Sequence, residues 1–186
     1  MKKRISKPKI AGISICLAIS LLLAACSVKN KLLHGNSLLR LTDDRLYEKI
    51  YFRNLDFVES FEDEETALSK MSTERKTVYI LSIFDMEIQN GGLCQFFVNS
   101  SRSLAPYVEE CLETVNAGEH KKLFSEFVAD NQIDLEHLES FQCNDFDEYI
   151  AQTKRYDFDA FDEAYIKCAP LQDAIVSYIR TNISEF

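Results

Sequence analysis

The scarcity of helix-breaking residues constrains the fold of this chain more than any other feature. Its 186 residues include only five glycines and three prolines, the residues that most strongly interrupt helices. No alternating polar and apolar run bounded by turn dipeptides predicts a strand. Apolar residues recur instead at helical spacing. We therefore predict an all-α fold, a single compact multi-helix domain of about six to eight helices.

Several helix ends can be placed from the sequence. Thr42 is a candidate N-cap for the first helix, and Asp43 and Asp44 would favour its first turn. Ser72 is the candidate cap of a later, strongly apolar helix. The last helix has the clearest apolar stripe and follows Pro170, a residue that suits a helix start. The stripe consists of Leu171, Ala174, Ile175, Tyr178 and Ile179.

The first 25 residues have the three parts of a secretory signal peptide. Positions 1–9 hold five basic residues and no acidic ones, and an apolar run follows at 10–23. That run is shorter than the roughly 20 apolar residues of a membrane-spanning helix. It closes on Leu-Ala-Ala-Cys, ending at Cys26. This ending resembles the lipobox of bacterial lipoproteins, in which the thiol is acylated and the chain is cleaved just before the cysteine.

The lipobox resemblance implies a domain organisation and a location. Residues 1–25 would be the lipoprotein signal peptide, 26–41 a lipidated tether and 42–186 the folded domain. Cys26 would be the lipidation site, with the lipid bilayer as the first partner, since two or three acyl chains make a lasting anchor. We therefore expect a membrane-anchored protein of the cell envelope, exported from the cytoplasm. The alternative is an ordinary signal peptide with an incidental cysteine.

The chain that begins at Cys26 is strongly acidic. The full sequence has 21 Lys and Arg residues, and five of them would leave with the signal. The remaining chain has 16 basic and 30 acidic side chains, a net charge of −14. Such a chain is not expected to bind nucleic acid directly, and it favours a basic protein as partner. The alternative is that the acidity serves solubility alone. The candidate acidic surface is a row near the C-terminus: Asp157, Asp159, Asp162 and Glu163.

Four cysteines remain in the exported domain. Cys94 and Cys111 fall among apolar residues of predicted helices, so they are expected to be buried free thiols. Exported thiols tend to pair, and Cys143–Cys168 is the candidate disulfide, although four cysteines allow three connectivities. The cysteine spacings match no zinc pattern, and the three histidines are far apart. No metal site is predicted.

The densest local signal is the segment 87–99. Asn90, Gly91 and Gly92 favour a helix stop, since glycine and asparagine tolerate positive φ, and a short helix would follow. Glu87 lies on the apolar side of the preceding helix, where a carboxylate is costly unless it is hydrogen-bonded. It would either accept backbone N–H groups of the restarted helix or take part in a polar ligand-binding cluster. The members of that cluster would be Glu87, Asn90, Gln95 and Asn99.

This segment also resembles a known family. Its pattern is Glu-x-x-Asn-Gly-Gly-x-x-Gln-Phe-Phe-x-Asn, preceded by Ser-Thr-Glu-Arg at 72–75 and followed later by Phe158, Phe161, Asp162 and Tyr165. It is similar to a bacterial domain family of unknown function typified by a DNA-mimic protein. The resemblance implies an all-helical, acidic, non-enzymatic domain without a cofactor. Its known member sequesters a DNA-binding transcription factor. The chain departs from the family pattern at Leu93, where phenylalanine is usual, and in its lipoprotein signal.

Three functions therefore remain open. The first is a non-enzymatic, membrane-anchored, acidic protein-binding module, for example one that neutralises a basic protein or toxin in the envelope. The second is a DNA-mimic antagonist of a DNA-binding protein, which requires a cytosolic location. The third is a small-ligand binder or an enzyme that uses the polar cluster of 87–99. The sequence names neither the partner nor the oligomeric state.

Overall fold

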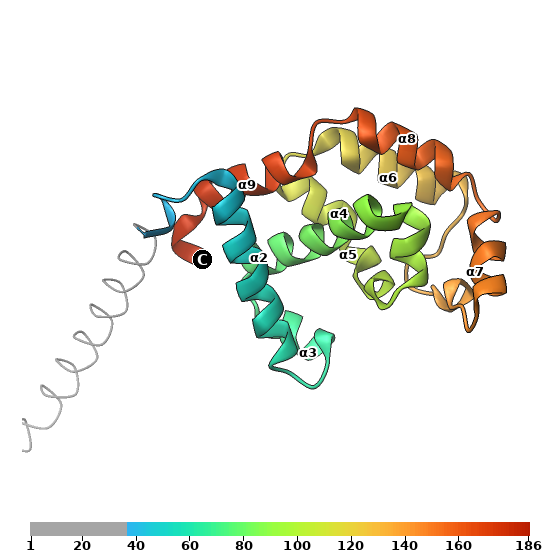
Figure 1. Ribbon diagram of the computed structural model, residues 1–186, viewed down its shortest axis with the longest axis horizontal. Helices are drawn as coiled ribbons and strands as arrows, with labels where there is room; N and C mark the ends of the chain where they lie inside the picture. The colour runs from blue at the N-terminus through green and yellow to red at the C-terminus, as the bar shows by residue number, and fades with distance from the viewer. Residues whose placement is uncertain (1–36) are drawn as a thin grey trace, which may run out of the picture.

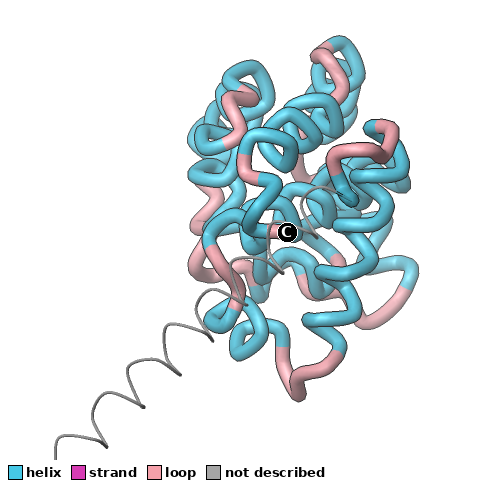
Figure 2. Tube along the Cα trace, turned by 90° about the vertical axis from the view of Figure 1, so that its left-hand side faces the viewer, coloured by secondary structure: helices cyan, strands magenta, loops and turns pink. Residues whose placement is uncertain are grey.

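The computed structural model describes residues 37–186, and every regular element in that range is a helix (Figure 2). The all-α prediction is confirmed, and residues 37–186 contain eight α-helices, at the upper end of the expected number. The α-helices are α2 (Asp43–Glu59), α3 (Glu64–Lys70), α4 (Thr73–Val98), α5 (Ala105–Thr114), α6 (Gly118–Asp130), α7 (Phe146–Thr153), α8 (Phe158–Lys167) and α9 (Leu171–Thr181). Three short 3₁₀ helices are η1 (Ser100–Leu104), η2 (Glu139–Phe141) and η3 (Ile183–Glu185). The sequence patterns do not predict α3, α7 or α8.

Helix α4 runs through the middle of the molecule and contacts α2, α5, α7, α8 and α9 (Figure 1). It is apolar around most of its circumference, as expected of a helix surrounded by others. Its Phe84 is fully buried, and the rings of Phe96, Phe124 and Tyr165 pack against it edge-on at 5.1, 5.5 and 6.1 Å between centroids. Such edge-to-face contacts add to the stabilisation from apolar burial.

Short polar side chains define several helix starts. The Ser72 hydroxyl accepts the Arg75 N–H at 3.3 Å, which confirms the predicted cap of α4. Thr42 occupies the N-cap position of α2 as predicted, but its side chain makes no capping hydrogen bond. The predicted position is therefore right and the predicted capping interaction is wrong. Three carboxylates cap helices: Asp63 for α3, Asp145 for α7 and Asp157 for α8. Part of the acidity of the chain therefore serves local structure.

Helix α4 changes direction at its two glycines. Gly91 has φ −161° and ψ 22°, and Gly92 has φ 78° and ψ 177°. The predicted corner is confirmed, and Gly92 is the residue that needs a positive φ. The second part of α4 then returns Phe96 and Phe97 to the core, where both are fully buried.

The domain begins before residue 42. Leu38 is 2% exposed and belongs to the core, and Leu41 packs against that core. The guanidinium of Arg180 in α9 donates to the Leu41 carbonyl at 3.0 Å and pairs with Asp43. The last residues of the predicted tether are therefore part of the domain. The predicted signal peptide and the predicted lipidation site Cys26 lie outside the described residues. Among the helices of 37–186, none combines the length and apolar character that a membrane span requires.

Candidate functional site

The polar residues of segment 87–99 converge on one buried carboxylate. Glu87 is 8% exposed. Its Oε2 accepts hydrogen bonds from the Gln95 side-chain amide at 2.7 Å and the Asn99 side-chain amide at 2.9 Å. Its Oε1 accepts the hydroxyl of Ser101 at 2.9 Å. The helical spacing of Gln95 and Asn99 aligns both amides with the carboxylate across the glycine corner.

The partners of Glu87 differ from the predicted ones. We expected Glu87 to accept backbone N–H groups of the restarted helix, and that expectation is wrong, since its partners are side chains. The backbone contact is made instead by Asp162 of α8, whose Oδ1 accepts the Leu93 N–H at 2.9 Å. Burial raises the pKa of Asp162, the hydrogen bond from Leu93 opposes this, and Asp159 adds a smaller upward contribution.

The corner fits closely against α8. A Cβ atom on Gly92 would lie 2.0 Å from Asp162 Oδ2, and one on Gly91 would lie 2.1 Å from Gln95 Oε1. Asn90 and Gly91 are exposed. Both oxygens of Glu87 are occupied by internal donors, so the carboxylate stabilises the corner and has little capacity left for a ligand. This geometry favours the structural interpretation of the motif over the ligand-binding one.

The comparison with family models gives a match over residues 69–182, to the family described as DMP19-like protein. That match covers more than half of the chain and includes the whole glycine-corner motif. The chain belongs to the DMP19-like family. The resemblance to a DNA-mimic family is therefore confirmed. Neither the search of curated proteins nor the search of solved structures found a match.

This DMP19-like domain contains a second buried polar group that the sequence patterns do not reveal. Asp85 is 9% exposed and accepts the hydroxyl of Tyr165 at 2.8 Å. The ring of His120 lies edge-on to Tyr165, 4.9 Å between centroids. Burial raises the pKa of Tyr165 and lowers that of His120, while Asp85 acts on His120 in the opposite direction. Tyr165 lies in the late family motif, but no signal marks its partner Asp85.

The predicted acidic row divides into surface and interior. Asp159 and Glu163 are exposed and lie one helical turn apart on α8, and Glu163 Oε2 is 3.9 Å from Lys167 Nζ. Asp157 is also exposed, and its carboxylate caps α8. Asp162 faces α4, so including it in the acidic surface was wrong. Adjacent residues of a helix point to different faces, so Asp162 faces α4 while its neighbour Glu163 faces solvent.

The described DMP19-like domain has a large surplus of carboxylates. Seven of the 21 basic residues precede Ser37, so residues 37–186 hold 14 basic and 30 acidic side chains, a net charge of −16. Only Asp85 and Glu87 among the acidic residues are buried. Within the described part of the chain, seven carboxylates take part in ion pairs. Most of the negative charge is therefore available to solvent or to a partner.

The cysteines of the domain are free thiols. Cys94 and Cys111 are buried as predicted, and burial raises the pKa of each to about 11. The predicted Cys143–Cys168 disulfide is wrong, since both are unpaired. Their sulfurs contact different carbonyls, Phe141 O and Ala164 O, each at 3.5 Å. Cys168 ends α8, whereas Cys143 lies in the loop after η2.

In residues 37–186, no group of three or more His, Cys, Asp or Glu is placed to hold a metal ion.

Proposed function

We propose that this DMP19-like protein is a non-enzymatic binding module, anchored to a cell-envelope membrane through acylated Cys26, whose acidic surface binds a basic protein such as an incoming toxin. The observation that carries the proposal is the surplus of exposed carboxylates, most of which have no ion-pair partner among the described residues. Uncompensated charge of one sign disfavours the compact state through self-repulsion. A basic partner would relieve that repulsion on binding.

The anchor would keep the domain near the bilayer surface. Ten residues, 27–36, separate the proposed acylated Cys26 from Ser37. Fully extended, they would reach at most about 40 Å. A domain with net charge −16 is repelled by anionic headgroups. It would therefore project into the aqueous layer, where a cationic protein approaching the membrane would meet it.

A second candidate is the DNA-mimic role, which family membership favours. Asp159 and Glu163 lie at i and i+4 on α8, and side chains at that spacing are about 5–6 Å apart at Cβ, close to the interval between phosphates along a strand. This role would require a cytosolic protein. The third function, ligand binding or catalysis at segment 87–99, has less support because internal donors occupy Glu87.

Two measurements test the proposal. Cells that express the full chain would be labelled with radioactive palmitate, with Cys26→Ala as the matched control. We expect label in the wild-type protein and none in the variant. The wild-type protein would then capture partners from an envelope extract at about 0.1 M salt and again near 1 M salt, where the Debye length falls from about 10 Å to about 3 Å.

The expected capture is a basic protein that is retained at low salt and released at high salt. If the protein carries no label, fractionates with the cytosol and captures a DNA-binding protein there, the DNA-mimic role would replace this proposal. Labelled protein that captures no basic protein at either salt concentration would contradict the binding function while leaving the anchor intact.

A further inference from the structure

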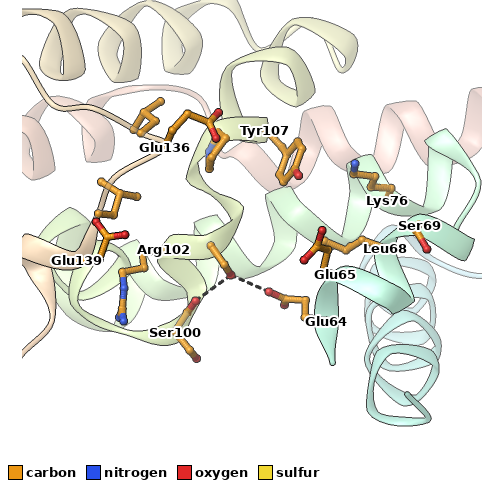
Figure 3. A pocket seen from close by; sticks show the side chains of 14 residues that line it. Glu64, Glu65, Leu68, Ser69, Lys76, Ser100, Arg102, Tyr107, Glu136 and Glu139 are labelled. Carbon is orange, nitrogen blue, oxygen red and sulfur yellow. Dashed lines mark hydrogen bonds between the residues drawn. The ribbon is translucent and has the colours of Figure 1, made fainter. Parts of the chain in front are cut away.

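A groove of about 880 Å³ lies on the face formed by α3, the start of α4, η1, the start of α5 and the segment that leads into η2 (Figure 3). This volume falls within the range of about 300–1,000 Å³ that small-molecule and cofactor sites occupy. None of the candidate residues of the acidic row on α8 lines it. The groove also lies apart from the glycine corner, whose buried Glu87 is not among its lining residues.

The groove has a mixed lining, with five apolar residues among nine polar or charged ones. Its apolar members are Leu68, Pro106, Tyr107, Leu135 and Leu138. Tyr107 is 37% exposed, so part of its ring is accessible from the groove. In Figure 3, Glu136 and Glu139 lie to the left of Tyr107, and Glu64 and Glu65 lie below it.

The carboxylates of the groove are not equivalent. Glu64 is committed to the fold, since its two oxygens accept the hydroxyls of Tyr79 and Ser103, each at 2.8 Å (the Ser103 bond is dashed in Figure 3). Glu65, Glu136 and Glu139 are exposed and form no ion pair with another described residue. They are the groups that a ligand can reach.

The two basic residues of the groove are already engaged. Lys76 places its ammonium 4.1 Å from the centre of the Tyr107 ring, a cation–π contact. The Arg102 guanidinium donates to the carbonyls of Val98 and Asn99, at 2.8 and 2.9 Å, where it caps the end of α4. Neither neutralises the three free carboxylates, so the groove presents negative charge around an apolar strip.

We propose that this groove binds a basic amphipathic peptide segment, with apolar side chains against Tyr107, Pro106 and Leu135 and with Lys or Arg groups reaching Glu65, Glu136 and Glu139. The inference rests on the proposed function and names the contact site of that basic partner. Lys and Arg suit such a lining because their methylene stems pack on apolar surface while their charged ends reach the rim. Uncharged apolar ligands would leave the carboxylates unused.

The test uses two synthetic peptides of equal length and charge, one alternating Lys with Leu and one alternating Lys with Ser. The lipidated protein, purified from cells that express the full chain, would be reconstituted in neutral phosphatidylcholine nanodiscs, and binding would be measured by surface plasmon resonance, with empty nanodiscs as the blank. Glu136→Gln with Glu139→Gln removes two charges from the groove. The matched control, Asp159→Asn with Glu163→Gln, removes two charges from the exposed face of α8.

We expect the groove double variant to raise the Kd of the Lys–Leu peptide at least about tenfold, and the α8 double variant to raise it no more than about threefold. The Lys–Ser peptide should bind the wild-type protein more weakly. Tyr107→Ala should weaken binding of the Lys–Leu peptide much more than binding of the Lys–Ser peptide, since only the former uses the ring. Tyr107 is partly exposed, so the domain should still fold.

Equal losses in the two double variants would show that binding follows overall charge and would overturn the groove assignment, while the acidic-module proposal would stand. If neither peptide binds but the protein captures a basic protein from the extract, the groove assignment would likewise be overturned and the acidic-module proposal would stand. Self-association of the wild-type protein that the groove substitutions abolish would identify a second copy as the occupant and overturn the assignment to a basic partner.

Discussion

The carboxylate of Asp162 accepts the backbone N–H of Leu93 at 2.9 Å, across 69 residues of sequence. Leu93 directly follows Gly92, at which α4 changes direction, so its N–H belongs to the first turn of a restarted helix and has no carbonyl one turn before it. Asp162 therefore does for this internal corner what an N-cap residue does at a helix start. The absence of a side chain at Gly92 leaves room for it.

Gly92→Ala should lower the free energy of unfolding by about 1–3 kcal/mol, the usual range for a residue held in an unfavourable backbone conformation. The φ of 78° strains any L side chain, and the new Cβ would lie 2.0 Å from Asp162 Oδ2. Urea unfolding followed by circular dichroism measures the change. Gly118→Ala is the matched control, since its Cβ would meet nothing within 4 Å. A loss at Gly118 equal to that at Gly92 would contradict this account.

Glu87→Gln should lower the free energy of unfolding by about 1–3 kcal/mol, because charge-assisted hydrogen bonds become neutral ones and an amide NH₂ replaces one acceptor. That NH₂ would face donors from Gln95, Asn99 or Ser101. Thermal melting measures the effect, with Asp159→Asn as a control for loss of an exposed carboxylate. An unchanged melting temperature combined with lost ligand binding would restore the interpretation of segment 87–99 as a binding site.

The burial of His120 predicts a pH dependence of stability. Burial lowers the pKa of His120 in the folded protein, and Asp85 and Glu119 oppose that shift. The unfolded chain therefore takes up the proton first, near pH 6.5. The stabilisation is present above that pH and is lost as the pH falls toward the lowered folded pKa.

The measurement is urea unfolding between pH 8 and pH 5 for the wild-type protein and His120→Phe. The wild-type protein should lose more stability than the variant over the acidic half of this range. The raised pKa of Asp162 acts with the opposite sign, but it is common to both proteins and cancels in the comparison. Parallel pH profiles would show that His120 does not titrate differently on folding.

The sequence predicts features that depend on local periodicity. The burial of Glu87 follows from its place seven residues after Ile80, on the apolar side of the helix. The corner at Gly92 follows from the glycine pair, and the cap at Ser72 from its residue type and position. Each of these depends on interactions within a few helical turns, which residue order largely determines.

The contacts between distant elements could not be predicted in this way. A carboxylate at Glu87 requires donors, but periodicity does not distinguish backbone donors from the amides of Gln95 and Asn99. Asp162 appears in the sequence as one of a row of acids, and only the packing of α8 on α4 turns it inward. The groove likewise joins three segments whose relative placement depends on the whole fold.

The exposed carboxylates of α8 should affect how fast a basic partner arrives more than how long it stays. Asp159 and Glu163 lie outside the proposed groove, so they contribute a long-range field without direct contact. Replacing them with Asn and Gln should slow association of the Lys–Leu peptide by a factor of about two to three at 0.1 M salt, and the difference should vanish near 1 M salt as the Debye length shrinks to about 3 Å. Dissociation should be unchanged. If the association rate changes neither with salt nor with these substitutions, the charges of this surface do not steer a partner, and their role is in solubility.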